Sequence, residues 1–139
     1  MSNDPKIDRL KTLTAFKDAE KRALEHLAAA ADEVTVDAGH VLISQGHIHH
    51  EAYVLESGTA EVEIDGVVVA QIPAGELIGE LGYFTQTPAS ATVRSSSEVS
   101  LLVIPYNRFE QILDENPKLL KSIAVHLAHR LVATDAKLH

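Results

Sequence analysis

The segment PAGELIGELGYFTQTPASATVRS at residues 73–95 decides how the rest of the chain is interpreted. Its pattern predicts a strand, a glycine turn, one helical turn that starts at Gly79-Glu80-Leu81, a loop and a second strand. A short helix entered through glycine presents backbone N–H groups that have no intrahelical partner, and such groups bind anions such as phosphate. Glycine also lets a ligand approach the backbone closely. The segment therefore predicts an anion-binding turn between two strands.

Short β-branched runs separated by glycine surround this segment. The predicted strands are 34–36, 41–44, 53–55, 60–64, 67–72, 91–93 and 99–104. Several alternate between apolar and polar residues, which gives a strand one buried and one solvated face. Asp65-Gly66 separates two of these runs and predicts a type I′ hairpin, because glycine accepts the positive φ required there. Many short strands with regular turns are typical of a sandwich, jelly roll or barrel.

Helix-forming sequence lies on both sides of the β region. Residues 7–31 predict a short helix followed by a longer one, and residues 106–115 predict a third with one apolar face. Asn116-Pro117 predicts the N-cap and first position of a long terminal helix. Small and apolar residues recur in that helix at spacings typical of a coiled-coil seam: Leu120, Ala124, Leu127, Leu131, Thr134 and Leu138. Two interpretations stay open, that this face packs on the β region or that it joins two copies.

Composition restricts the classes of protein that the chain can represent. Its 139 residues suit one domain, and they include no cysteine, which excludes cysteine proteases and zinc fingers and is expected of a cytoplasmic protein. The net charge of −8 repels phosphate backbones, so we expect no nucleic-acid binding by this chain alone. No apolar run approaches the roughly 20 residues that span a bilayer, and the start does not resemble a signal peptide. We therefore expect no membrane association.

Residues 73–95 resemble the phosphate-binding cassette of cyclic nucleotide-binding domains, as in bacterial catabolite activator proteins and the regulatory subunits of protein kinase A. That cassette reads Gly-Glu-Leu, six residues, then Pro-Arg-x-Ala-Thr-Val. In this chain the same spacing separates GEL at 79–81 from PASATV at 88–93. The resemblance covers nearly the whole chain, including AG at 38–39, QG at 45–46, YVLESG at 53–58 and LAHRL at 127–131.

The resemblance implies a mainly β fold with flanking helices, of the α+β class. It is an eight-stranded antiparallel double-stranded β-helix, or jelly roll, with N-terminal helices, a short cassette helix and two C-terminal helices. We expect residues 1–139 to form a single domain of this type, stand-alone or part of a longer bacterial protein. Its expected parts are N-terminal helices at 1–32, a β-roll at 33–105 with the cassette at 75–93, and C-terminal helices at 106–139.

The resemblance also implies a ligand site. In the family, the glutamate matching Glu80 binds the ribose 2′-hydroxyl, and N–H groups of the helical turn bind phosphate oxygens. Arg130 matches an arginine near that glutamate in some bacterial members, and Thr134 matches a threonine that contacts adenine. Each of these residues also has a structural alternative. Glu80 could be a carboxylate that stabilises the start of a helix, and Arg130 could be exposed or paired with a glutamate. Thr134 could be a small polar residue at a heptad position. The expected ligand-binding residues are Gly79, Glu80, Leu81, Ala89, Ser90, Ala91, Arg130 and Thr134.

Ala89 stands where the cassette has its phosphate-binding arginine. Loss of a charge-assisted contact of about 1.5–3 kcal/mol weakens binding by roughly 10- to 150-fold. Ser90 matches a serine that helps to hold phosphate in some bacterial members, but it brings no charge. Arg94 or Arg130 could compensate, and alternation along a strand does not decide whether Arg94 points into the site.

We therefore expect a non-catalytic, Crp-like regulatory sensor. It would bind cyclic AMP, cyclic GMP or a related anion weakly through the cassette and signal by movement of the C-terminal helix, with no cofactor or metal. The sequence contains no recognisable set of nucleophile, base and orienting acid, as a hydrolase would need, and no Walker-type phosphate-binding loop. The alternative is a degenerate fold that acts without nucleotide as a protein-interaction or dimerisation module. Its partner would be a second copy, through the terminal helix, or an effector protein or domain.

The histidines at 47–50 raise a third, less favoured hypothesis, a cupin-like metal-binding protein. His47 and His49, separated by one residue, would share a face of a strand and could hold one ion. In cupins a carboxylate follows the second histidine after three or four residues, whereas Glu51 follows after one. The later cupin histidine is replaced by Ile78. We therefore favour solvated loop histidines here.

Overall fold

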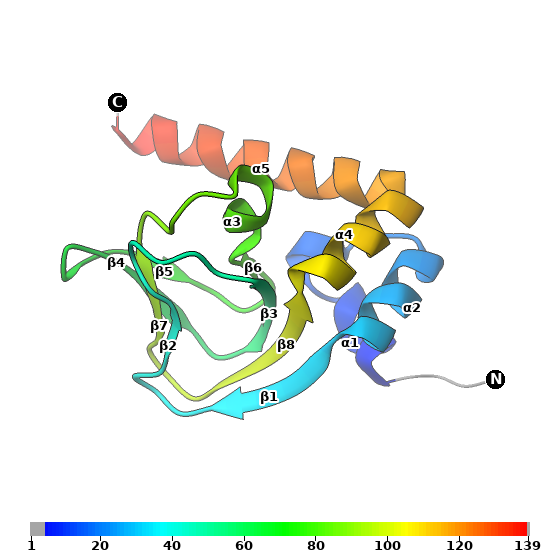
Figure 1. Cartoon of the computed structure of the whole chain (residues 1–139), viewed down its shortest axis with the longest axis horizontal. Coiled ribbons are helices and arrows are strands. Elements are labelled where there is room, and N and C mark those ends of the chain that lie inside the picture. Colours follow the sequence, from blue (N-terminus) through cyan, green and yellow to red (C-terminus); the bar gives the residue numbers. More distant parts are fainter. Residues whose placement is uncertain (1–4, 139) are drawn as a thin grey trace.

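The computed structural model describes residues 5–138, with side chains up to residue 129. Eight strands form two antiparallel four-stranded sheets that face each other as a jelly roll (Figure 1). This confirms the fold class expected from the sequence. The first sheet has the order β1 (Asp32–Val36), β8 (Val99–Pro105), β3 (Glu51–Ser57) and β6 (Leu77–Ile78). The second has the order β2 (Val41–Ile43), β7 (Thr92–Ser95), β4 (Ala60–Ile64) and β5 (Val67–Ile72).

Most of the helices gather at one end of the roll (Figure 1). The cassette helix α3 is Glu80–Thr85 and lies between β6 and β7 in the chain. Helices α1 and α2 are joined by the 3-10 turn η1 and precede the roll, whereas α4 and α5 follow it. Their bounds are α1 Pro5–Lys11, η1 Thr14–Phe16, α2 Lys21–Ala30, α4 Tyr106–Glu115 and α5 Pro117–Leu138.

The β4–β5 hairpin has the turn that its sequence predicts. Ile64 pairs with Val67, so the loop between the strands is two residues long. Asp65 has φ +52° and Gly66 has φ +82°, and a type I′ turn requires positive φ at both of these positions. The hairpin is therefore set by local sequence.

The β3–β8 pair at the centre of the first sheet is buried on both faces. Val54 of β3 and Leu102 of β8 pack against the helices, whereas Leu55 and Leu101, the next residue of β3 and the preceding one of β8, point into the roll. Successive side chains of a strand point to opposite faces, so a strand with two buried faces reads as a continuous apolar run, as β8 does. This sheet therefore separates a core inside the roll from a second core beneath the helices.

Helix α5 packs on this second core partly through residues outside the predicted seam. Leu119 and Ile123 are buried and Leu127 packs against the same core, whereas Leu120 and Ala124 are exposed. The seam positions therefore do not all pack on the roll. Three of them, Leu131, Thr134 and Leu138, have side chains outside the described residues.

Asn116 connects α4 with α5, and its side chain binds α4 and α2 where the sequence predicted a cap on α5. Its backbone carbonyl accepts the Leu119 N–H at the start of α5. Its side-chain amide donates to the Ile112 carbonyl at 2.8 Å and lies 3.0 Å from Nδ1 of His26. The buried amide therefore holds the end of α4 against α2.

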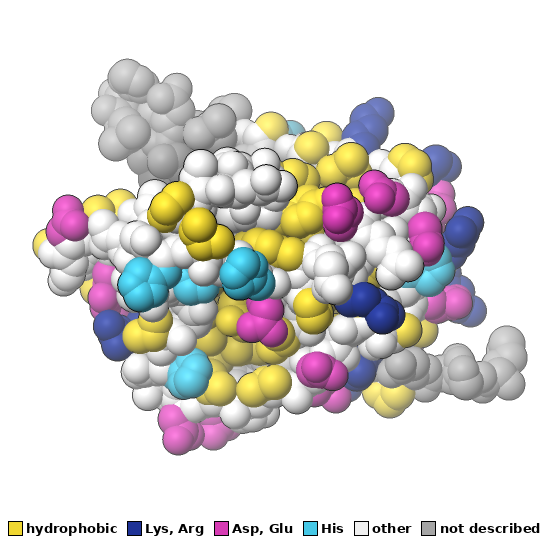
Figure 2. Space-filling view, in the orientation of Figure 1, with side chains coloured by type: hydrophobic (Ala, Val, Ile, Leu, Met, Phe, Trp, Pro, Cys, Tyr) yellow, Lys and Arg dark blue, Asp and Glu magenta, His cyan; other side chains and the backbone are white. Residues whose placement is uncertain are grey.

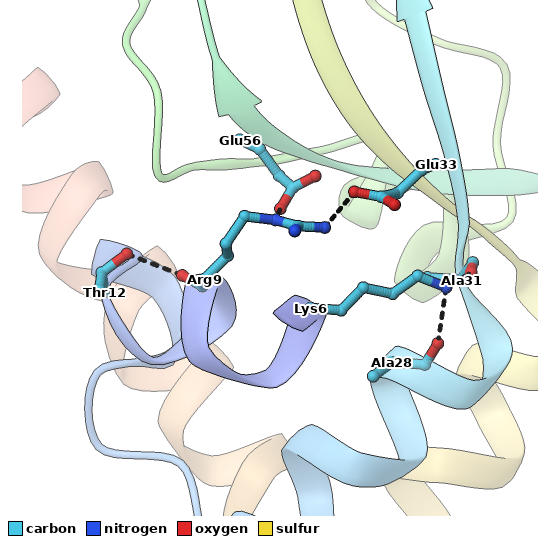
Figure 3. Close-up of polar contacts among 7 residues, drawn as sticks. All are labelled: Lys6, Arg9, Thr12, Ala28, Ala31, Glu33 and Glu56. Atoms are coloured by element: carbon cyan, nitrogen blue, oxygen red, sulfur yellow. Dashed lines mark hydrogen bonds and ion pairs between the residues drawn. The ribbon is translucent and has the colours of Figure 1, made fainter. Parts of the chain in front are cut away.

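Two side chains of α1 bind this helix to the first sheet and to the end of α2 (Figure 3). Arg9 Nε donates to the Glu56 carboxylate on β3 at 2.8 Å, and the same guanidinium also binds Glu33 on β1. Lys6 Nζ donates to the Ala31 carbonyl at the end of α2 at 3.0 Å. The Glu56 side chain is only 7% exposed, so Arg9 balances a nearly buried carboxylate.

Replacing Arg9 by methionine tests this contact. Methionine keeps much of the aliphatic length but leaves the Glu56 carboxylate without its cation. We expect the free energy of unfolding to fall by about 1–3 kcal/mol, measured by urea denaturation. Arg22→Met on the exposed side of α2 is the matched control, with an expected change below about 0.5 kcal/mol. Equal effects of the two substitutions would show that the Arg9 ion pair does not stabilise the fold.

Candidate functional site

The cassette helix begins at a glycine that no other residue replaces without strain. Gly79 has φ +84° immediately before α3. A Cβ atom there would lie 3.0 Å from the Glu51 carbonyl oxygen and 3.2 Å from the Ile43 side chain. Both the backbone conformation and the close approach to β3 therefore require glycine. This turn directs α3 across the mouth of the roll.

A cavity of about 340 Å³ lies between α3, the following loop and the inner faces of the roll. Apolar residues from the strands form its floor, among them Val62, Ile72 and Val93. The structure brings six of the expected ligand-binding residues to its wall; they are Gly79, Glu80, Leu81, Ala89, Ser90 and Ala91. The side chains of the other two, Arg130 and Thr134, lie outside the described residues. That these residues bind a ligand stays a prediction.

Glu80 places a carboxylate in the wall of the cavity. It is the first residue of α3 and is only 3% exposed. Tyr106, which also lines the cavity, donates from its hydroxyl to the Gly79 carbonyl. Burial, reinforced by the Glu80 carboxylate, raises the pKa of the Tyr106 hydroxyl, which therefore stays protonated at neutral pH. A nearly buried carboxylate in a cavity wall can accept hydrogen bonds from the hydroxyl groups of a ligand.

Arg94 does not supply a cation to the cavity. Its Nε lies 3.3 Å from the Glu63 carboxylate, and its guanidinium also reaches the Gly39 carbonyl at 3.4 Å. The preceding residue on β7, Val93, is buried and lines the cavity, so strand alternation turns Arg94 outward. The structure thus decides the orientation that the sequence left open, and Arg94 does not compensate for the alanine at position 89.

Among the described residues that line the cavity there is no lysine or arginine. Its polar side chains are the Glu80 carboxylate, the His49 imidazole and hydroxyl groups, including that of Ser90. Within this part of the chain, an anionic ligand would meet hydrogen-bond donors but no permanent positive charge.

The histidine segment is only partly the solvated loop expected from the sequence. His47 and His50 are exposed, but His49 is half-buried and lines the cavity. Its Nε2 lies 3.0 Å from the Ser44 backbone nitrogen. The described residues contain no group of three histidine or acidic side chains that could hold a metal ion. Sequence reasoning missed His49 because a histidine in a polar connection carries no periodic signal.

Two backbone hydrogen bonds fix this segment beside the cassette. The Gly46 N–H donates to the Ala89 carbonyl at 2.8 Å, and the Ala89 N–H donates to the His47 carbonyl at 2.9 Å. The segment around His49 is therefore held directly against position 89, although the two are about 40 residues apart in sequence.

The family model described as "Cyclic nucleotide-binding domain" matches residues 33–116, more than half of the chain. The chain belongs to this family. Curated relatives of this cyclic nucleotide-binding domain include the cAMP-dependent protein kinase regulatory subunit of Schizosaccharomyces pombe, 28% identical over 114 residues, covering 81% of this chain and 28% of the relative. Another is the cAMP-activated global transcriptional regulator CRP of Escherichia coli O157:H7, 30% identical over 102 residues, covering 69% of this chain and 49% of the relative. The domain thus spans less than half the length of these relatives.

Solved structures with the same fold include the catabolite activator protein of Thermus thermophilus, with a TM-score of 0.77 at 20% identity, covering 89% of this chain and 61% of that one. The N-terminal domain of a transcriptional regulator from Streptomyces coelicolor has a TM-score of 0.71 at 27% identity, covering 95% of this chain and 96% of that one. In the described part of the domain, no helix is both long and apolar enough to cross a bilayer.

The contact between Gly82 and Tyr106 can be tested by a double-mutant cycle. A Cβ atom at Gly82 would lie 2.7 Å from the Tyr106 hydroxyl, which the ring's contact with Tyr83 helps to hold in place. We expect Gly82→Ala to lower the free energy of unfolding by about 1–3 kcal/mol. With Tyr106→Phe present, the same change should be neutral or stabilising, because alanine exceeds glycine in helix propensity by up to about 1 kcal/mol. Urea denaturation of the four proteins measures the coupling, and additive effects would contradict it.

Proposed function

We propose that this domain is a regulatory sensor that binds a cyclic nucleotide, cyclic AMP or cyclic GMP, weakly in the cavity beneath α3. The observation that carries the proposal is the convergence of six cassette residues, with the nearly buried Glu80 among them, on one cavity in a domain of this family. Two of its relatives carry cAMP in their names, as a cAMP-dependent kinase regulatory subunit and a cAMP-activated regulator.

The cavity offers a suitable group for each part of such a ligand. Glu80 would accept a hydrogen bond from the ribose hydroxyl, since a carboxylate is an acceptor with two oxygens. The Ser90 hydroxyl and nearby backbone N–H groups would donate to the phosphate. The apolar strand residues would contact the sugar and base. The absence of a permanent cation among the described lining residues supports weak rather than tight binding.

The signal would pass from the cassette to the helices that follow the roll. Tyr83 of α3 makes edge-to-face contacts with Tyr106 and Phe109 of α4, with ring centroids 5.6 and 5.1 Å apart. Leu81 and Phe84 of the same helix remain 58% and 41% exposed, so α3 still has apolar surface to bury. We propose that ligand binding moves α3 and repacks these residues, and that α4 and α5 move with it.

An Ala89→Arg variant tests the ligand and its site together. A guanidinium at this position would meet the phosphate, so we expect the affinity for cyclic AMP to rise by about 10- to 100-fold over that of the wild type. Isothermal titration calorimetry with cyclic AMP and cyclic GMP measures both dissociation constants. Ala29→Arg is the matched control, because Ala29 is exposed on α2 outside the cavity, and this variant should bind as the wild type does.

If neither the wild type nor the Ala89→Arg variant binds either nucleotide at millimolar concentration while both remain folded, the cavity is not a nucleotide site. Equal gains in the Ala89→Arg and Ala29→Arg variants would show a nonspecific effect of added positive charge on a chain with net charge −8.

A second candidate function, dimerisation without nucleotide, is favoured by the exposed apolar residues of α5. Leu120 is 39% exposed and Ala124 is exposed beside it, and these are the first two positions of the seam recognised in the sequence. We expect dimerisation through this seam to be weakened at least about ten-fold by Leu120→Glu, because a buried carboxylate opposes association. Analytical ultracentrifugation measures the dissociation constant of the dimer. Val125→Glu is the control, since Val125 is similarly exposed at 45% but is not a seam position; a monomeric wild type would contradict the prediction.

A further inference from the structure

His49 lies at the junction of two cavities beside the cassette. It lines the 340 Å³ cavity with Glu80 and Ser90, and also a cavity of about 630 Å³ between α3, α4 and the β2–β3 connection. Figure 2 shows histidine side chains gathered on this face of the molecule, close to exposed hydrophobic side chains. Because Ala89 is hydrogen-bonded to the histidine segment, the imidazole belongs to the wall in which the cassette arginine would stand.

The Ser44 backbone lies against one ring nitrogen of His49. Nε2 lies 3.0 Å from the Ser44 backbone nitrogen, whose N–H it accepts, and 3.3 Å from the Ser44 carbonyl oxygen. A neutral ring accepts from the Ser44 N–H, whereas a protonated ring gives up that bond and must turn to donate to the Ser44 carbonyl. In both states Nδ1 carries a proton, and it has no hydrogen-bond partner within the described residues. One edge of the imidazole is thus anchored and the other keeps a donor for a ligand.

No permanent cation competes with this role among the described residues that line the two cavities. The charged groups there are the Glu80 carboxylate on α3 and the exposed carboxylates of Glu110 and Asp114 on α4. Tyr106 at the start of α4 and Tyr83 of α3 are the neutral titratable neighbours, and Tyr83 and the exposed His50 line only the larger cavity. Among these groups, His49 is therefore the one along the smaller cavity that can acquire a positive charge.

We propose that His49 replaces the cassette arginine as the anion-binding cation of this site, so that cyclic nucleotide is bound together with a proton. This inference rests on the proposed function and names the residue that would supply the positive charge for binding the phosphate. The imidazolium would donate from Nδ1 to a phosphate oxygen, and the cyclic phosphodiester keeps its negative charge across the neutral range. Affinity would consequently rise as the pH falls, because the charged ring binds the anion better than the neutral ring.

The test is calorimetric titration of cyclic AMP into the full chain at about pH 6 and about pH 8. We expect the wild type to bind about ten-fold or more tightly at the lower pH. His49→Gln should bind weakly and equally at both, because glutamine can still pair with Ser44 but does not charge. The controls His47→Gln and His50→Gln alter exposed neighbours and should behave as the wild type. Near pH 7, titrations in buffers of different ionisation enthalpy should show proton uptake by the wild type.

The outcomes separate this proposal from the function on which it rests. Proton uptake by the wild type, together with its loss in His49→Gln, would support the role of His49. Binding by the wild type that does not depend on pH and takes up no proton would overturn it and leave nucleotide binding intact, even if His49→Gln failed to fold. Binding only by Ala89→Arg would also overturn it, since His49 would not compensate. If neither the wild type nor Ala89→Arg binds cyclic AMP at either pH, both proposals are wrong.

Discussion

Burial of the β3–β8 strand pair on both faces holds the two halves of the molecule in one arrangement. Val54 and Leu102 face the helices while Leu55 and Leu101 fill the roll, and all four are almost completely buried. Each such side chain contributes roughly 1.5–3 kcal/mol through burial. A slip of one residue would exchange side chains between two cores of different shape, so the register of this pair is strongly specified. The roll and its helical cover therefore form as one cooperative unit.

The same strand pair places the parts of the candidate site. Glu51 at the start of β3 pairs with Pro105 at the end of β8, so the chain enters α4 at Tyr106 beside the strand against which Gly79 packs. The Tyr106 hydroxyl then binds the Gly79 carbonyl directly. The cassette and α4 are therefore in direct contact, through this hydrogen bond and through the aromatic contacts of Tyr83. In the proposed mechanism, a displacement of α3 would be transmitted to α4 through these contacts.

Much of the fold and part of the site could be predicted from sequence because they depend on local patterns. The spacing within the cassette identified the α3 turn. Asp65-Gly66 identified the β4–β5 hairpin, because these two residues accept the backbone conformation that the turn requires. Features that depend on tertiary packing were not accessible. Alternation could not orient Arg94 without knowledge of which β7 face was inward, and its partner Glu63 lies about 30 residues away. His49 reaches the cavity because of hydrogen bonds formed by its neighbours, which have no periodicity to recognise.

Two charged groups of the cavity would have separate effects: Glu80 would select the chemical groups of the ligand, and His49 would set the pH at which the ligand binds. When ionised, the nearly buried Glu80 carboxylate favours a ligand that donates a hydroxyl and repels a bare anion. A guanidinium beside it would offset that repulsion at every physiological pH. An imidazole offsets it only when charged. With His49 in this role, binding would depend on both nucleotide and pH, because among the described lining residues the charge of this side chain would decide whether the phosphate meets a cation or only hydrogen-bond donors.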